Sequence, residues 1–197
     1  MQVGEEINCE TYIECDVSDD NSIKNLIDVI DSKWGCLDGL VHAVGFAPAN
    51  ELEGDFTEVA TREGFKIAHD ISVYSFTALA QASKRLMKER NASLLTLSYL
   101  GAVRTLPNYN VMGVAKAGLE STTRYLANSL GKDNIRVNAI SPGAIATPIF
   151  WGGSGVSNTL SAEENERKLK KLEGNLAQAV PLKRSCLLYT SDAADEE

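Results

Sequence analysis

The sequence predicts an α/β protein built on a doubly wound parallel sheet. Apolar, β-rich runs alternate along the chain with segments whose apolar residues recur at helical spacing. This alternation is typical of a parallel sheet with helices on both faces. Polar or glycine-rich breaks follow the apolar runs, as expected where ligands bind beyond the carboxyl ends of parallel strands. The 197 residues, 44% of them apolar, suit one domain with a sizeable core.

The first half of the chain predicts two strands and two helices. Residues 11–17, TYIECDV, form a short β-rich run, and Ser18 is expected to cap a helix that ends at Gly35. Residues 38–45, DGLVHAVG, are apolar at consecutive positions, which is typical of a strand that is buried on both faces. A long helical pattern then covers about 61–88, so the order so far is strand, helix, strand, helix.

The second half repeats that order. Residues 92–101, ASLLTLSYLG, predict the third strand, and a helix is expected over about 110–130, ending at Gly131. Residues 135–141, IRVNAIS, predict the fourth strand, and the loop PGAIATP follows it.

The start of the chain lacks one feature of a complete dinucleotide-binding fold. Such a fold normally opens with a strand and a glycine-rich turn that binds the pyrophosphate. The only glycine before residue 11 is Gly4. We therefore expect an incomplete sheet without its first two strands.

Composition argues against several classes of partner. The net charge of −8 disfavours nucleic acid, whose phosphates need a basic patch. The sequence shows neither a charged-then-apolar leader, which would predict secretion, nor an apolar run of about 18 residues, which would predict a membrane span. The cysteines show no CxxC pair and no metal-ligand spacing: Cys9, Cys15, Cys36 and Cys186. We expect reduced thiols in a cytoplasmic protein that binds no metal, nucleic acid or membrane.

One stretch, LSYLGAVRTLPNYNVMGVAKAG (97–118), carries the clearest chemical signal. A tyrosine and a lysine on one helical face can form a proton-donating, sugar-binding pair. Tyr109 and Lys116 are seven residues apart, which is nearly two helical turns, so they share a face about 10 Å apart along the axis. The position four before Lys116 holds Met112, and Tyr99 ends the preceding strand.

Several long, ungapped motifs together resemble one family. GFAP, TREGFKIAHDIS, LLTLSYLGA, PNYNVMG and IRVNAIS are similar to the bacterial enoyl-acyl-carrier-protein reductases, a divergent branch of the short-chain dehydrogenase/reductase superfamily. The resemblance covers about residues 11–147. It implies a Rossmann-like fold, reduction of trans-2-enoyl thioesters of acyl carrier protein with NADH (NADPH is left open), and a homotetramer in the full-length family. The usual superfamily motif is Tyr-x3-Lys, so Met112 disfavours a keto-reductase.

The resemblance implies catalytic roles for three residues. In that family, the tyrosine at the position of Tyr109 donates a hydrogen bond to the thioester oxygen while negative charge develops there. The position of Lys116 binds the nicotinamide ribose hydroxyls, and Tyr99 borders the same pocket. Ser98 is interpreted as a structural hydroxyl, because Tyr99 takes the neighbouring role. An unperturbed tyrosine titrates near pH 10, so Tyr109 is expected to be a neutral donor.

The resemblance also implies cofactor and substrate contacts. Asp16 and Val17 match adenine contacts, although a turn-starting role would equally explain Asp16. Val44 matches a position near the adenosine ribose, and Gly45 lets the chain pass close to it. Ala47 matches a substrate contact. The loop that closes on the nicotinamide and the pyrophosphate corresponds to Ile145 and Thr147.

Three other features are interpreted as structural. His42 is expected to be a core histidine with its hydrogen bonds satisfied. His69 is expected to support packing or a subunit contact. The Glu/Lys-rich run 162–174 predicts a solvated helical face.

The resemblance ends after about Thr147. Residues 142–185 resemble a different short-chain dehydrogenase subfamily, which suggests a chimeric chain, with a natural variant loop over 148–185 as the alternative. Residues 186–197, CLLYTSDAADEE, resemble a translated sequencing adapter and are interpreted as a non-native tail. We thus expect residues 1–185 to form one partial domain that lacks its C-terminal strand.

These departures leave alternatives open. We expect the isolated polypeptide to fold poorly and to be weakly active or inactive. One alternative function is a short-chain dehydrogenase that acts on a 3-oxoacyl thioester or another carbonyl or hydroxyl substrate. A second is an inactive fold fragment or interaction module that binds no cofactor.

Overall fold

A single parallel sheet organises the described part of the chain. The structure is a computed structural model, which describes residues 9, 11–143, 167, 170 and 174. Within these residues three strands pair in chain order: β1 (Gly39–His42), β2 (Ser93–Leu97) and β3 (Arg136–Ile140). His42 lies beside Thr96, and Leu97 lies beside Ile140. The carboxyl ends of the three strands therefore share one edge, as the strand–helix alternation predicted.

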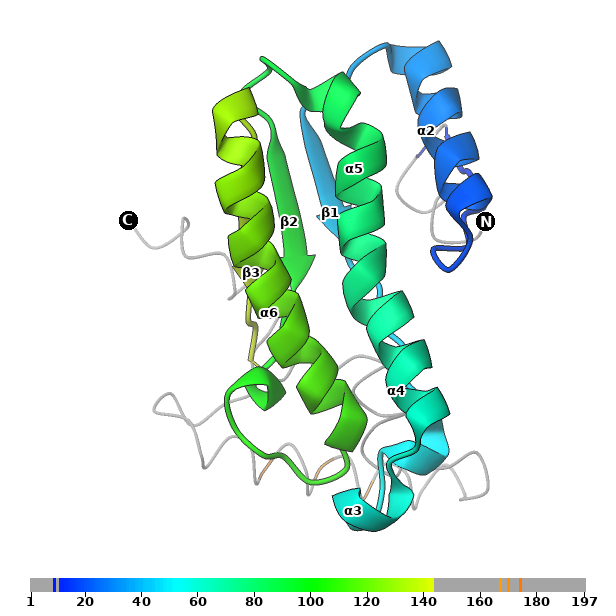
Figure 1. Ribbon diagram of the computed structural model, residues 1–197, viewed down its shortest axis with the longest axis vertical. Helices are drawn as coiled ribbons and strands as arrows, with labels where there is room; N and C mark the ends of the chain where they lie inside the picture. The colour runs from blue at the N-terminus through cyan, green and yellow to red at the C-terminus, as the bar shows by residue number, and fades with distance from the viewer. Residues whose placement is uncertain (1–8, 10, 144–166, 168–169, 171–173, 175–197) are drawn as a thin grey trace.

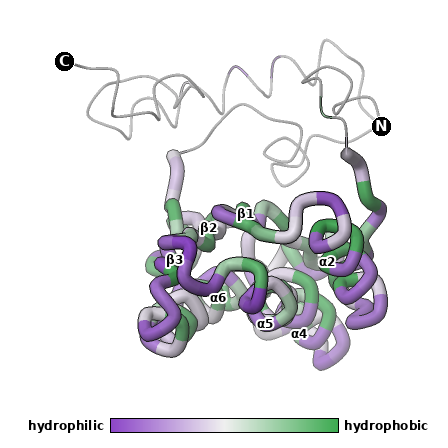
Figure 2. Tube along the Cα trace, turned by 90° about the horizontal axis from the view of Figure 1, so that it is seen from above, coloured by the Kyte–Doolittle hydropathy of each residue, from purple (hydrophilic) through white to green (hydrophobic). Residues whose placement is uncertain are grey.

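Helices cover one face of this sheet. The described helices are α2 (Asp20–Trp34), α3 (Phe56–Val59), α4 (Arg62–His69), α5 (Ser75–Met87) and α6 (Asn110–Leu130). Short 3-10 turns occupy η1 (Ala49–Glu51), η3 (Leu100–Ala102) and η4 (Gly131–Asp133). Figure 1 shows α5 and α6 side by side along the strands, and Figure 2 shows α4, α5 and α6 on the same side of the sheet.

Helices were expected on both faces of the sheet, but among the described residues they cover only one face. On the opposite face of the sheet, Val41 of β1 keeps 63% of its surface exposed. Its neighbour in the ladder is Leu95 of β2. The sheet thus has one covered and one open apolar face within the described part of the chain.

The predicted strand over residues 11–17 does not form. These residues belong to no ladder among the described residues, in which β1 pairs with β2 alone. A β-rich sequence becomes a strand only where a neighbouring strand satisfies its backbone groups. The predicted helix cap is also shifted by one residue, because Asp19 and not Ser18 accepts the hydrogen bond from the N–H of Asn21, at 3.0 Å. Gly35 ends α2 in the left-handed conformation, as expected.

The long helix predicted over 61–88 is divided in two. Thr61 caps α4 by accepting a hydrogen bond from the N–H of Gly64, at 3.0 Å. A π-helical turn, η2 (Asp70–Tyr74), then separates α4 from α5. The apolar spacing that predicted one helix continues through this turn, so the periodicity alone did not reveal it.

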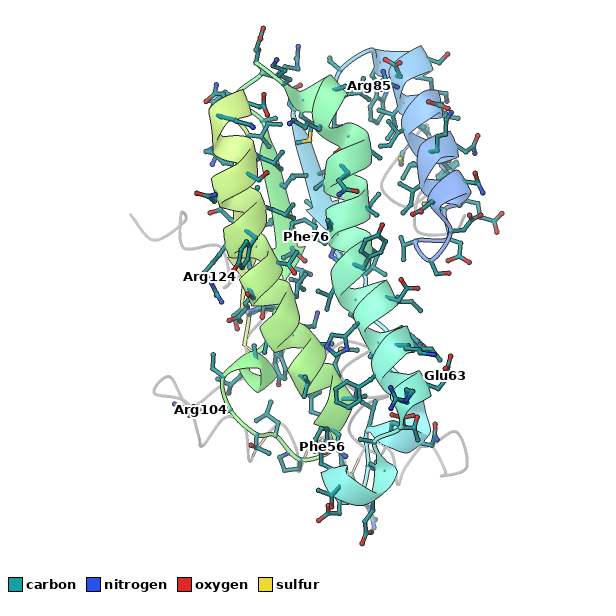
Figure 3. The ribbon with its side chains drawn as sticks, viewed as in Figure 1. Phe56, Glu63, Phe76, Arg85, Arg104 and Arg124 are labelled. Atoms are coloured by element: carbon teal, nitrogen blue, oxygen red, sulfur yellow. The ribbon has the colours of Figure 1, made fainter. Side chains whose placement is uncertain are left out.

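The core lies between the sheet and the pair α5 and α6. Its fully buried side chains come from α5, β2, α6 and the segment before β3: Phe76, Met87, Leu94, Leu119 and Ile135. Figure 3 shows Phe76 between the ribbons of α5 and α6. At the other side of α5, Arg85 binds Asp31 of α2, with 2.6 Å between Nη1 and Oδ2. Burial of this apolar set fixes both helices against the strands.

His42 confirms the interpretation of a satisfied core histidine. It is 1% exposed, and its ring lies 5.1 Å from that of Phe76 between centroids. Its Nδ1 lies 2.9 Å from Thr96 Oγ1, and its Nε2 lies 2.8 Å from Ser75 Oγ. Burial, and after it the positive charge of Lys116, lowers the pKa of His42 from 6.5 to about 4.

This shifted pKa predicts an acid-dependent loss of stability. The unfolded chain takes up a proton on His42 near pH 6.5, whereas the folded protein resists protonation until about pH 4. The stabilisation present above pH 6.5 is therefore lost as the pH falls from 6.5 towards 4, by about 3 kcal/mol in total. Urea denaturation at several pH values should show this loss in the wild type and not in His42→Gln, in which the carboxylates titrate alike. Equal pH dependence in the two proteins would contradict it.

Candidate functional site

The carboxyl edge of the sheet gathers most of the residues singled out in the sequence. The segments that leave the strands there are 43–47 after β1, 98–99 after β2 and 141–143 after β3. Helix α6 packs along β3 and against η3, so one face of the helix is directed at this edge. The candidate site is the place where α6 meets these segments.

Lys116 links α6 to the end of β2 and lies beside the loop that follows β1. Its Nζ donates a hydrogen bond to the carbonyl oxygen of Leu97, the last residue of β2, at 2.7 Å. A β-carbon placed on Gly45, after β1, would lie 3.6 Å from the same Nζ. Burial lowers the pKa of Lys116. An ammonium has three N–H donors, so the bond to Leu97 leaves donors for a hydroxylated ligand.

Tyr99 and Tyr109 lie against one another beside this lysine's helix. Their ring centroids are 5.2 Å apart and the rings meet edge to face, at 63°. Tyr109 is the residue immediately before α6, and Tyr99 immediately precedes η3. Burial raises the pKa of both phenols, and the neighbouring Tyr99 raises that of Tyr109 further. Both are therefore neutral hydrogen-bond donors at pH 7, as expected for Tyr109 from the sequence.

Two glycines allow this close approach. A β-carbon on Gly101, in η3, would lie only 2.4 Å from Cδ1 of the Tyr109 ring. A β-carbon on Gly113, in α6, would lie 3.1 Å from the carbonyl oxygen of Gly101. The turn after β2 can thus rest directly on the first turns of α6, and the ring of Tyr109 lies over Gly101.

Glu120 belongs to the site although the sequence did not single it out. It accepts a hydrogen bond from the hydroxyl of Ser98, with 2.6 Å between Oγ and Oε1. Ser98 is 4% exposed, and its N–H donates to the carbonyl of Ile140 at 2.7 Å. These contacts agree with the structural role expected for Ser98. The signal that could have revealed Glu120 is its spacing, because it follows Lys116 by four residues and so shares its helical face.

The residues matched to cofactor contacts are less closely grouped. Asp16 is exposed and accepts hydrogen bonds from the N–H and hydroxyl of Ser18, at 2.9 and 2.6 Å, which lower the pKa of its carboxyl group. This is the turn-starting arrangement left open by the sequence. Val17 packs against the cluster around Ile23. In the described residues, neither Asp16 nor Val17 makes a hydrogen bond or ring contact with the two tyrosines or Lys116.

The loop after β1 brings other predicted contacts to the site. Val44 is half-buried and Gly45 is exposed beside Lys116. Ala47, the residue matched to substrate contact, is 9% exposed and packs with Val111 and Ala115 of α6. Ile145, Thr147 and the tail 186–197 lie outside the described residues, and of the proposed chimeric segment beyond 143 only 167, 170 and 174 are described, each helical and exposed as expected for the run 162–174.

His69 packs within its own helix rather than at this edge. Its Nδ1 lies 2.8 Å from the carbonyl oxygen of Phe65, and the two rings are stacked 5.5 Å apart. In the described part of the chain, no three His, Cys, Asp or Glu side chains gather as a metal site. None of the helices described there is long and apolar enough to cross a membrane.

Comparison with protein families gives one match over nearly the whole chain. The family described as enoyl-(acyl carrier protein) reductase matches residues 1–195. An NADH-type enoyl-acyl-carrier-protein reductase of Haemophilus influenzae is 47% identical over 170 residues, which are 86% of this chain and 64% of that protein. The Escherichia coli reductase of the same name is 51% identical over 142 residues, or 72% of this chain and 54% of that protein. The chain thus spans between half and two thirds of these relatives' length.

Solved structures of the same kind share the fold. An NADH enoyl-acyl-carrier-protein reductase of Aquifex aeolicus superposes with a TM-score of 0.79 at 39% identity, covering 93% of this chain and 66% of that one. A reductase of Anaplasma phagocytophilum, solved in complex with NAD, gives 0.75 at 38% identity, covering 93% of this chain and 62% of that one. These similarities confirm the Rossmann-like α/β class.

The packing of Tyr109 on Gly101 predicts a sensitive position. In Gly101→Ala the added methyl group would lie 2.4 Å from the ring of Tyr109, so the ring or the turn must move. We expect a loss of about 1–3 kcal/mol in the free energy of unfolding and shifted NMR signals of the Tyr99 and Tyr109 rings. Gly131→Ala is the control, because a β-carbon there meets no described atom within 4 Å. Similar stability and spectra for both variants would contradict the packing argument.

Proposed function

The chain belongs to the enoyl-acyl-carrier-protein reductase family, and on that premise we propose that it serves the NADH-dependent reduction of trans-2-enoyl thioesters carried by acyl carrier protein. The observation that carries this proposal is the pair of neutral, half-buried phenols of Tyr99 and Tyr109 at the start of the helix that holds Lys116. The described cysteines are free thiols, as expected of a cytoplasmic enzyme: Cys9, Cys15 and Cys36.

Tyr109 is proposed as the residue that stabilises the reacting thioester. Bound NADH would supply the hydride for the β-carbon of the enoyl group. The phenol of Tyr109 then donates a hydrogen bond to the thioester oxygen, where negative charge develops. Its raised pKa keeps the proton on the phenol throughout the neutral pH range, so the donor is always in the required form. Tyr99, in edge contact with Tyr109, borders the same space and fixes the orientation of that ring.

Lys116 is proposed to hold the sugar next to the nicotinamide. The space in front of Gly45 fits this role, since a side chain there would fill the gap beside the ammonium group. The bond from Lys116 to Leu97 fixes the direction of the ammonium, and its remaining donors suit ribose hydroxyls. Val44 would lie by the adenosine, Asp16 and Val17 by the adenine, and Ala47 by the substrate. The remaining proposed contacts are Ile145 and Thr147.

The two alternative functions differ from the proposed one in the residues that they need or in the ligand that they bind. A carbonyl-reducing dehydrogenase would need a tyrosine four residues before Lys116, where Met112 stands, and a serine hydroxyl directed at substrate. The hydroxyl of Ser98 instead donates to Glu120. An inactive fold would bind no dinucleotide.

The proposed assembly is a homotetramer formed through the outer faces of α5 and α6. Two adjoining hollows of about 590 and 600 Å³ lie there, and Val73, Thr77 and Thr122 line both. Exposed aromatic side chains flank them, with Tyr125 at 77% and Tyr74 at 48% exposure. Apolar hollows of this extent on paired helices suit a self-complementary interface between copies of the chain.

The role of Tyr109 predicts a loss of turnover without loss of fold. Tyr109→Phe removes only the hydroxyl, so we expect kcat for a crotonyl thioester to fall about 100-fold, measured as NADH oxidation. Tyr12→Phe, at an exposed position before α2, should leave the rate unchanged. Turnover of a 3-oxoacyl thioester alone would favour the dehydrogenase alternative. No turnover of either thioester by the wild type would favour the inactive fold.

The proposed interface predicts a change in assembly when charge enters the hollows. We expect the wild type to sediment as a tetramer and Thr122→Lys to sediment as a smaller species, because the ammonium would be buried between copies. Asn128→Lys, at an exposed position of the same helix, is the control and should remain tetrameric. A monomeric wild type would contradict the proposed assembly.

A further inference from the structure

Two buried serines lie in and immediately after the π-helical turn η2. Ser72 lies within the turn and Ser75 begins α5, and both are completely buried. A π-helical turn widens the helix by one residue, and such turns are frequent at functional sites. Apolar packing in the core requires neither hydroxyl. The hydrogen bonds that each hydroxyl makes therefore indicate the role of the turn.

Ser75 anchors the turn to the strand β1. Its hydroxyl donates to the carbonyl of Ile71 at 2.7 Å and lies 2.8 Å from Nε2 of His42. Thr96 Oγ1 lies 2.9 Å from Nδ1 of His42, and its hydroxyl donates to the carbonyl oxygen of His42 at 3.2 Å. A network of hydrogen bonds thus runs from Thr96 of β2 through His42 of β1 and Ser75 to Ile71 of η2. The position of the turn relative to the sheet is fixed by it.

Ser72 holds the loop that follows β1. The N–H of Phe46 donates to Ser72 Oγ at 2.9 Å, and the same hydroxyl donates to the carbonyl oxygen of Phe46 at 3.0 Å. Both backbone groups of one loop residue are therefore satisfied by one side chain from a distant helix. The aromatic ring of Phe46 is itself 50% exposed, so apolar burial does little to hold this residue.

The loop held in this way is the one that meets Lys116. A β-carbon on Gly45 would lie 3.8 Å from Ser72 Oγ and 3.6 Å from Lys116 Nζ. The hydroxyl and the ammonium thus flank the same glycine, and Ala47 follows one residue after the anchored Phe46. A shift of this loop would move both the space beside the ammonium and the position of Ala47.

We propose that Ser72 is a positioning residue, which holds residues 45–47 against Lys116 so that the dinucleotide and the enoyl thioester bind in register. This inference rests on the proposed reductase function. Ser72 acts through the backbone of Phe46 and touches no reacting atom. Its loss should therefore weaken binding more than it slows the chemical step.

The test compares two buried serines of the same helical segment. Ser72→Ala removes the loop anchor, whereas Ser83→Ala removes a hydroxyl, also completely buried, that donates to Leu79 in its own helix at 2.7 Å. Amide hydrogen exchange at Phe46, measured by NMR, reports the anchor directly. We expect Ser72→Ala to speed this exchange by about tenfold or more, and Ser83→Ala to leave it unchanged. KM for the crotonyl thioester and the NADH dissociation constant should each rise severalfold in Ser72→Ala alone, with kcat changed less.

Each outcome decides the inference separately from the function. Faster exchange at Phe46 together with a raised KM or weaker NADH binding supports it. Unchanged exchange overturns it, and so does faster exchange with KM and NADH affinity both unchanged. If the wild type reduces no enoyl thioester, the proposed function fails. The amide hydrogen exchange of Phe46 and the NADH dissociation constant, measured in the wild type and in Ser72→Ala, still decide the role of Ser72. Should Ser72→Ala not fold, Ser72→Cys keeps the side-chain volume with a weaker hydrogen-bonding group, and the same readouts apply.

Discussion

The parallel ladder of β1, β2 and β3 is the constraint on which the candidate site depends. Its register sets His42 beside Thr96 and Leu97 beside Ile140, so three chain segments leave the sheet at one edge. The hydrogen bond from Lys116 to Leu97 then ties α6 to that edge. Because parallel strands run in the same direction, the loops that follow them lie together at this edge even though they are far apart in the sequence.

One face of α6 carries the contacts that shape the site. Along it, Gly113 lies against the carbonyl of Gly101, Lys116 reaches the end of β2, and Glu120 accepts the hydroxyl of Ser98. These positions recur at intervals of three and four residues, which is the repeat of a helical face. A rigid helix thus spaces the tyrosine pair, the ammonium and the carboxylate in order along the same edge.

Much of this arrangement could be predicted from the residues alone, and the failures share a physical cause. The strands after residue 38 and the helix α6 follow from local periodicity, and they formed where expected. The run over 11–17 has the same β-rich character, yet it lacks a ladder partner among the described residues. The turn η2 could not be recognised either, because its apolar residues keep helical spacing while Ser72 within it bonds to the distant loop residue Phe46 and the adjoining Ser75 contacts His42 of β1.

The sequence by itself determined which residues share a helix or a strand. The seven-residue spacing of Tyr109 and Lys116 predicts that both face the same side, since helical geometry depends only on position along the chain, and in the structure Tyr109 immediately precedes the helix α6 that holds Lys116. Only the tertiary structure decided the partners: Ser98 with Glu120, Ser72 with the backbone of Phe46, and His42 with Ser75 and Thr96. Those bonds join groups brought together by burial of the core, and no local pattern specifies which distant groups will meet.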